Sequence, residues 1–494
     1  GRAHLWDGSA YGKLITNAFA KYNYKNERLE LYRFDIEGYG ATITGGGTVS
    51  KDAINIDFEG KKIDMGRLLI NTDYKVDGLL AGRGTITGSM DNPQFNGYIL
   101  SDALSINGQL LTDIHGHVYA DKSVVNVQDF SFAESNGGRY VAKGGMKLDD
   151  SKQLFGVLDV TNGSVKNLLA LLDRKNEHLD GKLNGSVEIG GTKDNPSVTV
   201  DGKINEVSID DKVVGDATID ASLANRKFKI TTLKLPVDEG LIAMGGTLDL
   251  DGEADLQVAL KDVDIVPFLP LVGKDIQATG WVTGVVNVTG KTKNPKVELS
   301  GAVESGSFNG IGIDEGFVLA TMQDHVIQIQ RIQGAKGGYK LSLYGKIPLA
   351  ALYTSGYIEA SNAKSMDVTI DFNEADMAVI PLVTTSVKDA TGPLKGVIRL
   401  TGTVDQPEAY GTVSVRNGTM KLANVDNEIT GIDGDLIFSG QQGDFQSRIN
   451  MGKGSAGLAA KVNWSGHELT NYKAAVQLDG LDVRSEYIRG PLNG

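Results

Sequence analysis

The chain has 494 residues, and its 49 Lys and Arg against 62 Asp and Glu leave a formal net charge of −13 at pH 7. This acidic balance opposes binding to nucleic-acid phosphates and electrostatic attraction to anionic lipid surfaces. The chain contains no cysteine, which excludes disulfides, thiol nucleophiles and Cys-ligated zinc and fits an oxidising compartment. With 63 glycines, 11 prolines and 40% hydrophobic residues, it is too apolar for disorder and suits many short strands joined by glycine-bearing turns.

No stretch of the sequence is predicted to cross a membrane. The most apolar window, residues 263–272, is half the length of a membrane span and contains Asp264 and two prolines. The chain begins at Gly1 without an initiator Met or a signal-peptide pattern. We therefore expect a piece of a longer protein, whose targeting signal or membrane anchor lies outside it.

A repeat of about one hundred residues organises the chain. The pattern G-x3-G-x5-G-x4-P occurs four times without gaps, and a further glycine follows each copy within six residues. Its positions are Gly78, Gly82, Gly88 and Pro93; Gly181, Gly185, Gly191 and Pro196; Gly280, Gly284, Gly290 and Pro295; and Gly392, Gly396, Gly402 and Pro407. A fifth copy starts at Gly490. Such self-similarity predicts a repeat architecture, with the end of a preceding repeat in 1–77, units at 78–180, 181–279, 280–391 and 392–489, and a truncated repeat at 490–494.

The third copy has a superficial likeness to a phosphate-binding loop. Five residues separate Gly284 from Gly290, whereas a P-loop has four. The residues between them are mostly β-branched, and no helical pattern follows Pro295. We therefore interpret these glycines as structural.

A short apolar cluster precedes the first glycine of each copy, within residues 65–70, 165–172, 264–272 and 376–383. In the second cluster an apolar helical face follows Ser164, a candidate N-cap, and consists of Val165, Leu168, Leu169 and Leu172. This pattern predicts one or two helical turns. We expect them to cap the core rather than to recognise a partner.

Between these clusters, apolar and polar residues alternate. The alternation is clear in residues 216–223, 254–260 and 445–451. It is typical of antiparallel strands with one dry face and one wet face. The dipeptides Asp251-Gly252, Asn417-Gly418 and Asp433-Gly434 predict hairpin turns between such strands.

These patterns predict an all-β fold. With about 12 residues for each strand and its turn, the chain would form roughly 40 strands stacked over the order of 100 to 190 Å. Open sheets beyond about ten strands must curl, split or close, and glycine permits the necessary bulges and bends. We therefore expect an elongated, repetitive antiparallel sheet folded into a U-shaped groove, with its apolar face inside and short helical turns between repeats.

The repeated unit, G-x-x-x-G-x-h-x-h-x-G-(S/T/K)-x-x-(N/Q)-P-x-h with h hydrophobic, resembles the AsmA-like superfamily of bacterial envelope proteins, and its TamB-like members most closely. The alternating strands and the apolar cluster before each unit add to the resemblance, which covers nearly the whole chain. It implies the U-shaped sheet called a β-taco, crossing the periplasm of a diderm bacterium from inner to outer membrane. The family's N-terminal membrane helix, its inner-membrane anchor, is missing here.

The resemblance implies a bridge-like lipid transfer protein that carries phospholipid toward the outer membrane and supports its integrity. A continuous apolar groove would keep acyl chains out of water throughout that path, without moving parts. We expect inward aliphatic side chains to line it: Ala217, Ile219, Ala221, Leu223, Phe228, Ile230, Leu248, Leu250, Ala254, Leu256, Val258, Leu260, Phe445, Ile449 and Met451. An ordinary filled core is the alternative for any single residue.

Other functions remain as alternatives. An exposed sheet edge could template strands of an outer-membrane β-barrel partner, an activity that the resemblance implies for some members. A surface adhesin or β-helical passenger would instead show rungs of about 20 residues. The observed repeat of about one hundred residues argues against that alternative.

We expect no enzyme, cofactor or metal site. The acidic residues lie mostly on wet strand faces or in turns. His115 and His117 project to one side of a strand, yet no third ligand is identifiable at a suitable spacing.

Overall fold

The computed structural model describes residues 1–10, 13–38, 40–68, 75–171, 178–249, 251–272, 277–308, 311–337, 339–349, 365–382, 386–403, 405–466, 468–484 and 489–494. In these residues thirty strands belong to one open antiparallel sheet, which confirms the predicted all-β fold class. The chain divides into two compact units. The first comprises Gly1–Asp238 with Met244–Leu250, and the second comprises Glu239–Ala243 with Asp251–Gly494.

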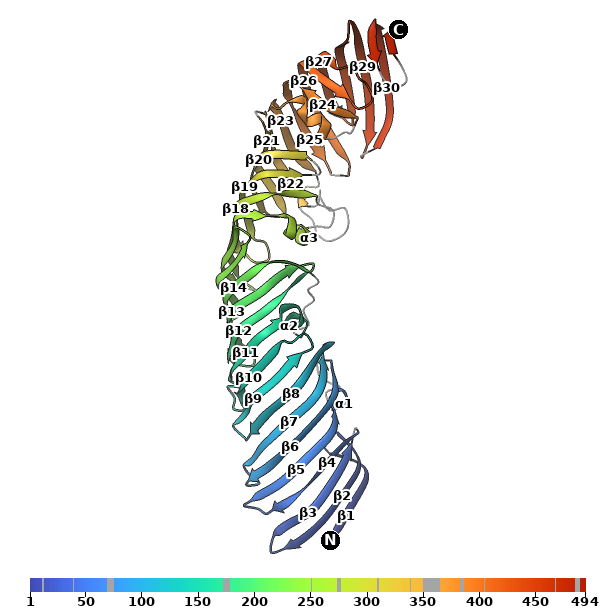
Figure 1. The fold of residues 1–494 in the computed structure, drawn as a ribbon. Helices are drawn as coiled ribbons and strands as arrows, with labels where there is room; N and C mark the ends of the chain where they lie inside the picture. The colour runs from blue at the N-terminus through green and yellow to red at the C-terminus, as the bar shows by residue number, and fades with distance from the viewer. Residues whose placement is uncertain are drawn as a thin grey trace. The chain divides into compact units, whose positions relative to one another are not determined.

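In the first unit, every strand from β1 to β14 pairs antiparallel with the next strand in chain order (Figure 1). The elements are β1 Arg2–Ala10, β2 Lys13–Lys25, β3 Arg28–Gly38, β4 Ala41–Val49, β5 Ile54–Asp64, α1 Met65–Leu68, β6 Val76–Gly88, β7 Pro93–Ile106, β8 Gln109–Ala120, β9 Val124–Glu134, β10 Arg139–Lys147, β11 Leu154–Ser164, α2 Val165–Leu171, β12 Leu179–Gly191, β13 Pro196–Ile209, β14 Lys212–Ala224 and β15 Lys227–Val237. Strand β16, Gly240–Asp249, contributes residues to both units.

In the second unit, each strand from β17 to β22 pairs with the next strand in chain order. Strand β23 pairs with β25 rather than with β24, and β25 to β30 again pair in chain order. Strand β24 pairs with β26. The elements are β17 Glu253–Asp264, η1 Val266–Phe268, α3 Leu269–Val272, β18 Ala278–Lys291, β19 Lys296–Phe308, β20 Ile311–Gln323, β21 Val326–Lys336, β22 Tyr339–Pro348, β23 Met366–Glu374, η2 Met377–Leu382, β24 Val387–Thr391, β25 Leu394–Gly402, β26 Pro407–Leu422, β27 Ile429–Gly440, β28 Gln442–Met451, β29 Gly454–Ser465, β30 Glu468–Asp479, β31 Leu481–Arg484 and β32 Arg489–Leu492. The last two form a separate hairpin.

Two expectations about turns are wrong. Asn417-Gly418 lies inside β26 and Asp433-Gly434 inside β27, where the strand register shifts, whereas Asp251-Gly252 does separate β16 from β17. A β-bulge uses the same tolerance of positive φ that a hairpin turn uses, and Asn417 has φ 53°. Strands that pass through bulges without turning are longer than expected, so the described residues form 32 strands rather than roughly 40.

The bulges recur where strands bend, and each leaves a backbone N–H outside the ladder. A side chain of the neighbouring strand accepts this N–H at four bulges. The pairs of donor and acceptor residue are Asn162 with Asn184 at 2.9 Å, Glu206 with Asp216 at 2.8 Å, Asp262 with Thr283 at 2.9 Å and Asn417 with Asp433 at 2.9 Å. All four donor residues have positive φ.

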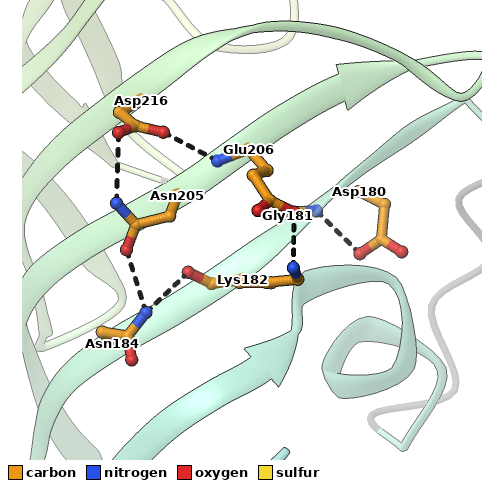
Figure 2. Close-up of polar contacts among 7 residues, drawn as sticks. All are labelled: Asp180, Gly181, Lys182, Asn184, Asn205, Glu206 and Asp216. Atoms are coloured by element: carbon orange, nitrogen blue, oxygen red, sulfur yellow. Dashed lines mark hydrogen bonds and ion pairs between the residues drawn. The ribbon is translucent and has the colours of Figure 1, made fainter. Parts of the chain in front are cut away.

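Figure 2 shows how such contacts join β12, β13 and β14. The Nδ2 of Asn184 donates to Asn205 Oδ1 at 3.0 Å, and the Nδ2 of Asn205 donates to Asp216 Oδ2 at 3.2 Å. The backbone hydrogen bond from Glu206 and the bond from Asn205 lower the pKa of the Asp216 carboxyl. Lys182 Nζ also lies 2.5 Å from Glu206 Oε2 on the exposed surface. Polar groups of neighbouring strands therefore tie the bend together.

The third glycine of each repeat is the last or the second-last residue of a strand before a hairpin. Gly88, Gly191, Gly290 and Gly402 have φ values of 93°, 77°, 83° and 82°. The repeat proline then opens β7, β13 and β26, and Pro295 directly precedes β19. This placement suits a residue that has no N–H for the ladder.

The apolar clusters form the expected short helices: α1, α2, η1 with α3, and η2. The Ser164 hydroxyl accepts the N–H of Asn167 at 3.1 Å, as an N-cap does, whereas Leu172 lies outside the described residues. The buried Asp376 plays a similar part at η2. Its carboxylate accepts the N–H groups of Ala378 and of the repeat glycine Gly392, at 2.9 and 2.8 Å.

The best-covered core lies beside these helices. Around α2, Tyr140, Val160 and Leu183 are buried together, with Leu168 packed against them. The Tyr140 hydroxyl donates to Glu134 Oε1 at 2.6 Å. Burial, and then this hydrogen bond, raise the pKa of the Tyr140 phenol.

Replacing two repeat glycines with alanine distinguishes the effect of backbone strain on stability from the effect of a steric clash. In Gly290→Ala the new Cβ meets open space at φ 83°, so we expect a loss of about 1–2 kcal/mol in the free energy of unfolding. In Gly402→Ala the Cβ also collides with the Gln406 carbonyl, so the loss is larger. Gly457→Ala, at open space without positive φ, should change stability by less than about 0.5 kcal/mol. Urea unfolding measures all three, and equal losses at Gly290 and Gly402 would contradict the account.

The buried phenol gives a second prediction. Tyr140 is 0% exposed, and Tyr140→Phe leaves a carboxylate oxygen of the 4% exposed Glu134 without its donor. We expect a loss of about 1–3 kcal/mol in the free energy of unfolding. Tyr472→Phe, at a tyrosine that is 73% exposed, is the matched control and should be neutral. A neutral Tyr140→Phe would show that this hydrogen bond does not hold the core.

Candidate functional site

Residues paired directly across antiparallel strands point to the same face of a sheet. In the first unit, one such row crosses β1 to β15, and every member is apolar or glycine. We name it the first apolar row: Ala3, Ala20, Phe34, Gly45, Phe58, Gly84, Gly97, Val118, Val127, Gly144, Gly156, Ile189, Val198, Leu223 and Phe228. At about 4.8 Å per strand it extends roughly 65 Å along the sheet.

The second unit contains a row of the same kind, which crosses β17 to β23 and β25 to β30. We name it the second apolar row: Leu260, Gly284, Gly301, Val318, Ile332, Leu343, Ile370, Ile398, Gly411, Phe438, Gly443, Val462 and Tyr472. Again no charged side chain interrupts the row. Each unit thus carries an apolar track that runs across its strands.

The side chains of these rows are only partly covered. Ile189 and Phe228 of the first row are 38% and 39% exposed, and Ile332 of the second is 39% exposed. The protein exposes 29605 Å² in total, whereas two compact globules of half its mass each would expose about 21,000 Å². Apolar side chains that remain exposed in continuous rows are typical of a binding site rather than of a closed core.

The opposite face of the same strands is largely polar. Next to the first apolar row, along β10 to β15, lies a row formed by Lys143, Val157, Glu188, Thr199, Ser222 and Lys229. The two faces therefore differ sharply in chemistry, although both reach solvent.

The helices lie on the apolar face. Leu168 of α2 packs against Leu183, which shares a face of β12 with Ile189, six residues further on. Near α2, Leu183 is 9% and Ala217 is 5% exposed, whereas Phe228, beside a hairpin turn, is 39% exposed. From β12 to β15 the apolar face is thus covered beside α2 and more exposed at the hairpin that joins β14 to β15.

In the first unit, the predicted groove residues of β14 and β15 share this face. Leu223 and Phe228 belong to the first apolar row, Ala221 pairs with Ile230 beside it, and Ile219 follows. Ala217 is buried near α2, and Leu248 is half-buried in β16. Leu250 lies outside the described residues.

The second unit divides its predicted residues between an open face and a packed core. Leu260 belongs to the second apolar row, Leu256 and Val258 lie on the same face of β17, and Phe445 lies on that of β28. Ala254 is 3% exposed. Ile449 and Met451 belong to a buried cluster with Met377 of η2 and Leu481 of β31.

Sequence reasoning missed the glycines inside the apolar rows. Gly84 pairs with Gly97 and Gly284 with Gly301, so side chains are missing from two neighbouring strands at once. Such gaps deepen an apolar face without adding polar groups. A signal was present, because each pair is placed symmetrically about the hairpin that the repeat proline opens.

The apolar rows offer the chemistry that a hydrocarbon chain needs. They present aliphatic and aromatic carbon, and the backbone beneath them is hydrogen-bonded within the ladder. Acyl chains could therefore leave water there without desolvating a polar group. In the part of the chain that the structure describes, no group of three or more His, Cys, Asp or Glu could hold a metal ion.

The two histidines remain on the polar side of β8. His117 contacts Asn96 Oδ1 and stacks on Tyr98 with ring centroids 4.6 Å apart. His115 lies 2.8 Å from the Ser131 hydroxyl. Each is engaged by neighbouring side chains of the sheet.

Comparisons with known proteins return no relative. No family model, no curated protein and no solved structure matches the chain. Among the described residues, no helix is long and apolar enough to cross a membrane.

A matched pair of charged variants tests the apolar face. Ile189 and Val157 are both 38% exposed but lie on opposite faces of adjacent strands. Ile189→Asp should weaken binding of the neutral dye N-phenyl-1-naphthylamine by about fivefold, because it places charge in the apolar row. Val157→Asp should leave binding unchanged. Equal effects in a fluorescence titration would show that the apolar face is not the binding surface.

Proposed function

We propose that this protein is a bridge-like lipid transfer protein, which carries phospholipid along the apolar face of its sheet. The observation that supports the proposal most strongly is the pair of apolar rows, partly exposed and free of charged side chains over fifteen strands in one unit and thirteen in the other. An ordinary core would bury such residues under a second layer.

The energetics favour a track over a single pocket. Each methylene brought out of water gains about 0.8 kcal/mol, so an acyl chain of about 15 methylenes loses on the order of 12 kcal/mol if it is exposed again. A lipid therefore moves only where apolar contact is maintained. The uncovered hairpin side would leave the polar headgroup in water while the chains slide.

The proposed setting follows from the resemblance to TamB-like members of the AsmA-like superfamily. We place the protein in the periplasm of a diderm bacterium, between inner and outer membranes. Transport would need no catalytic residue and no cofactor, because the lipid is moved without a change in its bonds. An outer-membrane β-barrel protein is a proposed partner.

Site-specific photo-crosslinking tests lipid occupancy. A photo-crosslinking amino acid at Leu223 or Leu256, on the apolar faces of β14 and β17, should yield phospholipid adducts in cells. The same amino acid at Asp220 or Gln257, on the opposite faces of those strands, should yield about tenfold less. Equal labelling at all four positions, or none, would refute the proposal.

Charge on the track should block transfer. Leu223→Asp or Leu256→Asp should slow transfer of fluorescent phospholipid between donor and acceptor vesicles by at least about fivefold, because each places a carboxylate where acyl chains pass. Both leucines are only half-buried, so the sheet should still fold. Ser222→Asp, which adds the same charge to the opposite face of β14, is the control. Unchanged transfer in the leucine variants would contradict the proposed route.

A further inference from the structure

One cavity of the second unit extends from the open apolar face into buried structure. It has a volume of about 250 Å³ and lies between β20 to β23 and η2. Ile332, Leu343 and Ile370, which line it, belong to the second apolar row. Ile332 is 39% exposed, whereas Ala375 and Asp376, which line the cavity beside η2, are 3% and 1% exposed. The cavity is therefore a recess that leads from the second apolar row to η2.

The interior of this cavity is aliphatic. The large apolar side chains in its lining are Ile313, Ile332, Leu341, Leu343, Ile370 and Val379. Among the described lining residues Asp376 is the only acid, and its two carboxylate oxygens already accept backbone N–H groups. Lys336 is exposed at the end of β21. Lys340 pairs with Ala335, on the face of β21 and β22 opposite Leu343, so its charge is directed away from the interior.

Glycine leaves room for this space. Gly312 lines the cavity from β20 and Gly334 lines it from β21, where a Cβ would meet only Ile313 within 4 Å, at 3.5 Å. An empty apolar cavity lowers stability in proportion to its volume, and water gains little from entering one because it finds few hydrogen-bond partners there. The cavity is therefore suited to an apolar ligand.

The volume of the cavity limits the size of that ligand. An apolar cavity of about 150 Å³ holds benzene, so in proportion one of about 250 Å³ holds about ten carbon atoms. A phospholipid acyl chain of about 16 carbons is longer than this. Only the end of such a chain fits, and the rest of the lipid stays outside, on the second apolar row.

We infer that this cavity binds the methyl end of one acyl chain of a transported phospholipid and is a resting site on the track. The inference rests on the proposed lipid track and adds a place where the lipid is retained. On the open rows an acyl chain contacts protein on one side only. In the cavity the end of the chain is surrounded by aliphatic side chains, so a lipid leaves this site more slowly than it leaves the rows.

Photo-crosslinking in the full chain tests the resting site. An aliphatic diazirine amino acid of about the size of leucine is placed at Leu341 in the cavity or at Leu256 on the open face of β17, and vesicles of dimyristoylphosphatidylcholine are supplied. Fragmentation of the adducts by mass spectrometry locates the new bond along the acyl chain. At Leu341 we expect at least about fivefold more adduct in the distal half of the chain than in the half nearer the headgroup, because the methyl end enters the cavity first. At Leu256 we expect no preference.

Filling variants test whether the cavity itself holds the chain. Gly334→Leu should reduce adducts at Leu341 by at least about tenfold and leave those at Leu256 unchanged, since the new side chain occupies the space. Ala378→Leu, which fills the cavity from η2, should have the same effect. Unchanged adducts at Leu256 show that each variant still folds. Gly457→Leu, at a glycine with open space around it, is the control and should leave both sites unchanged.

The two proposals fail differently. Three results would overturn the resting site and leave the track: adducts at Leu256 with none at Leu341, adducts at Leu341 spread evenly along the acyl chain, or adducts at Leu341 that survive both filling variants. Adducts at Leu341 alone would support the cavity as a lipid site and contradict a continuous track. No adduct at either position would overturn both proposals.

Discussion

Every strand of an antiparallel sheet divides its side chains between two faces, and one of those faces here is apolar, with no second sheet over it in the part of the chain that the structure describes. Among the described residues, only short helices and the β31–β32 hairpin pack against it, as Met377 and Leu481 do in the second unit. The remaining apolar side chains are left partly exposed in rows. A surface of this kind has a physical reason to exist if hydrocarbon occupies it part of the time.

The bends that shape the sheet depend on residues with little or no side chain and on small polar groups. Glycines with positive φ end strands at the repeat hairpins, and bulged residues such as Glu206 and Asn417 bend the strands between turns. At these two bulges, Asp216 and Asp433 of the neighbouring strands accept the backbone N–H of Glu206 and Asn417. Side chains of the polar face therefore stabilise the strands at these bulges.

Periodicity predicted the strands, the apolar face and the short helices, because these depend on local pattern. It misplaced Asn417-Gly418 and Asp433-Gly434, because turns and bulges both favour residues with positive φ. They differ in whether the chain then reverses direction or continues as a strand. It also could not separate Leu256, on an open face, from Ile449, in a packed core, because both alternate with polar neighbours.

Native mass spectrometry of the protein purified from its own cells, followed by extraction and identification of what it carries, tests the central claim most directly. The account predicts phospholipid bound in more than one copy per chain, released when the protein is unfolded. Peptides of outer-membrane β-barrel proteins in its place would favour strand templating. A protein free of lipid in every preparation would contradict the claim that the apolar rows form a track for acyl chains.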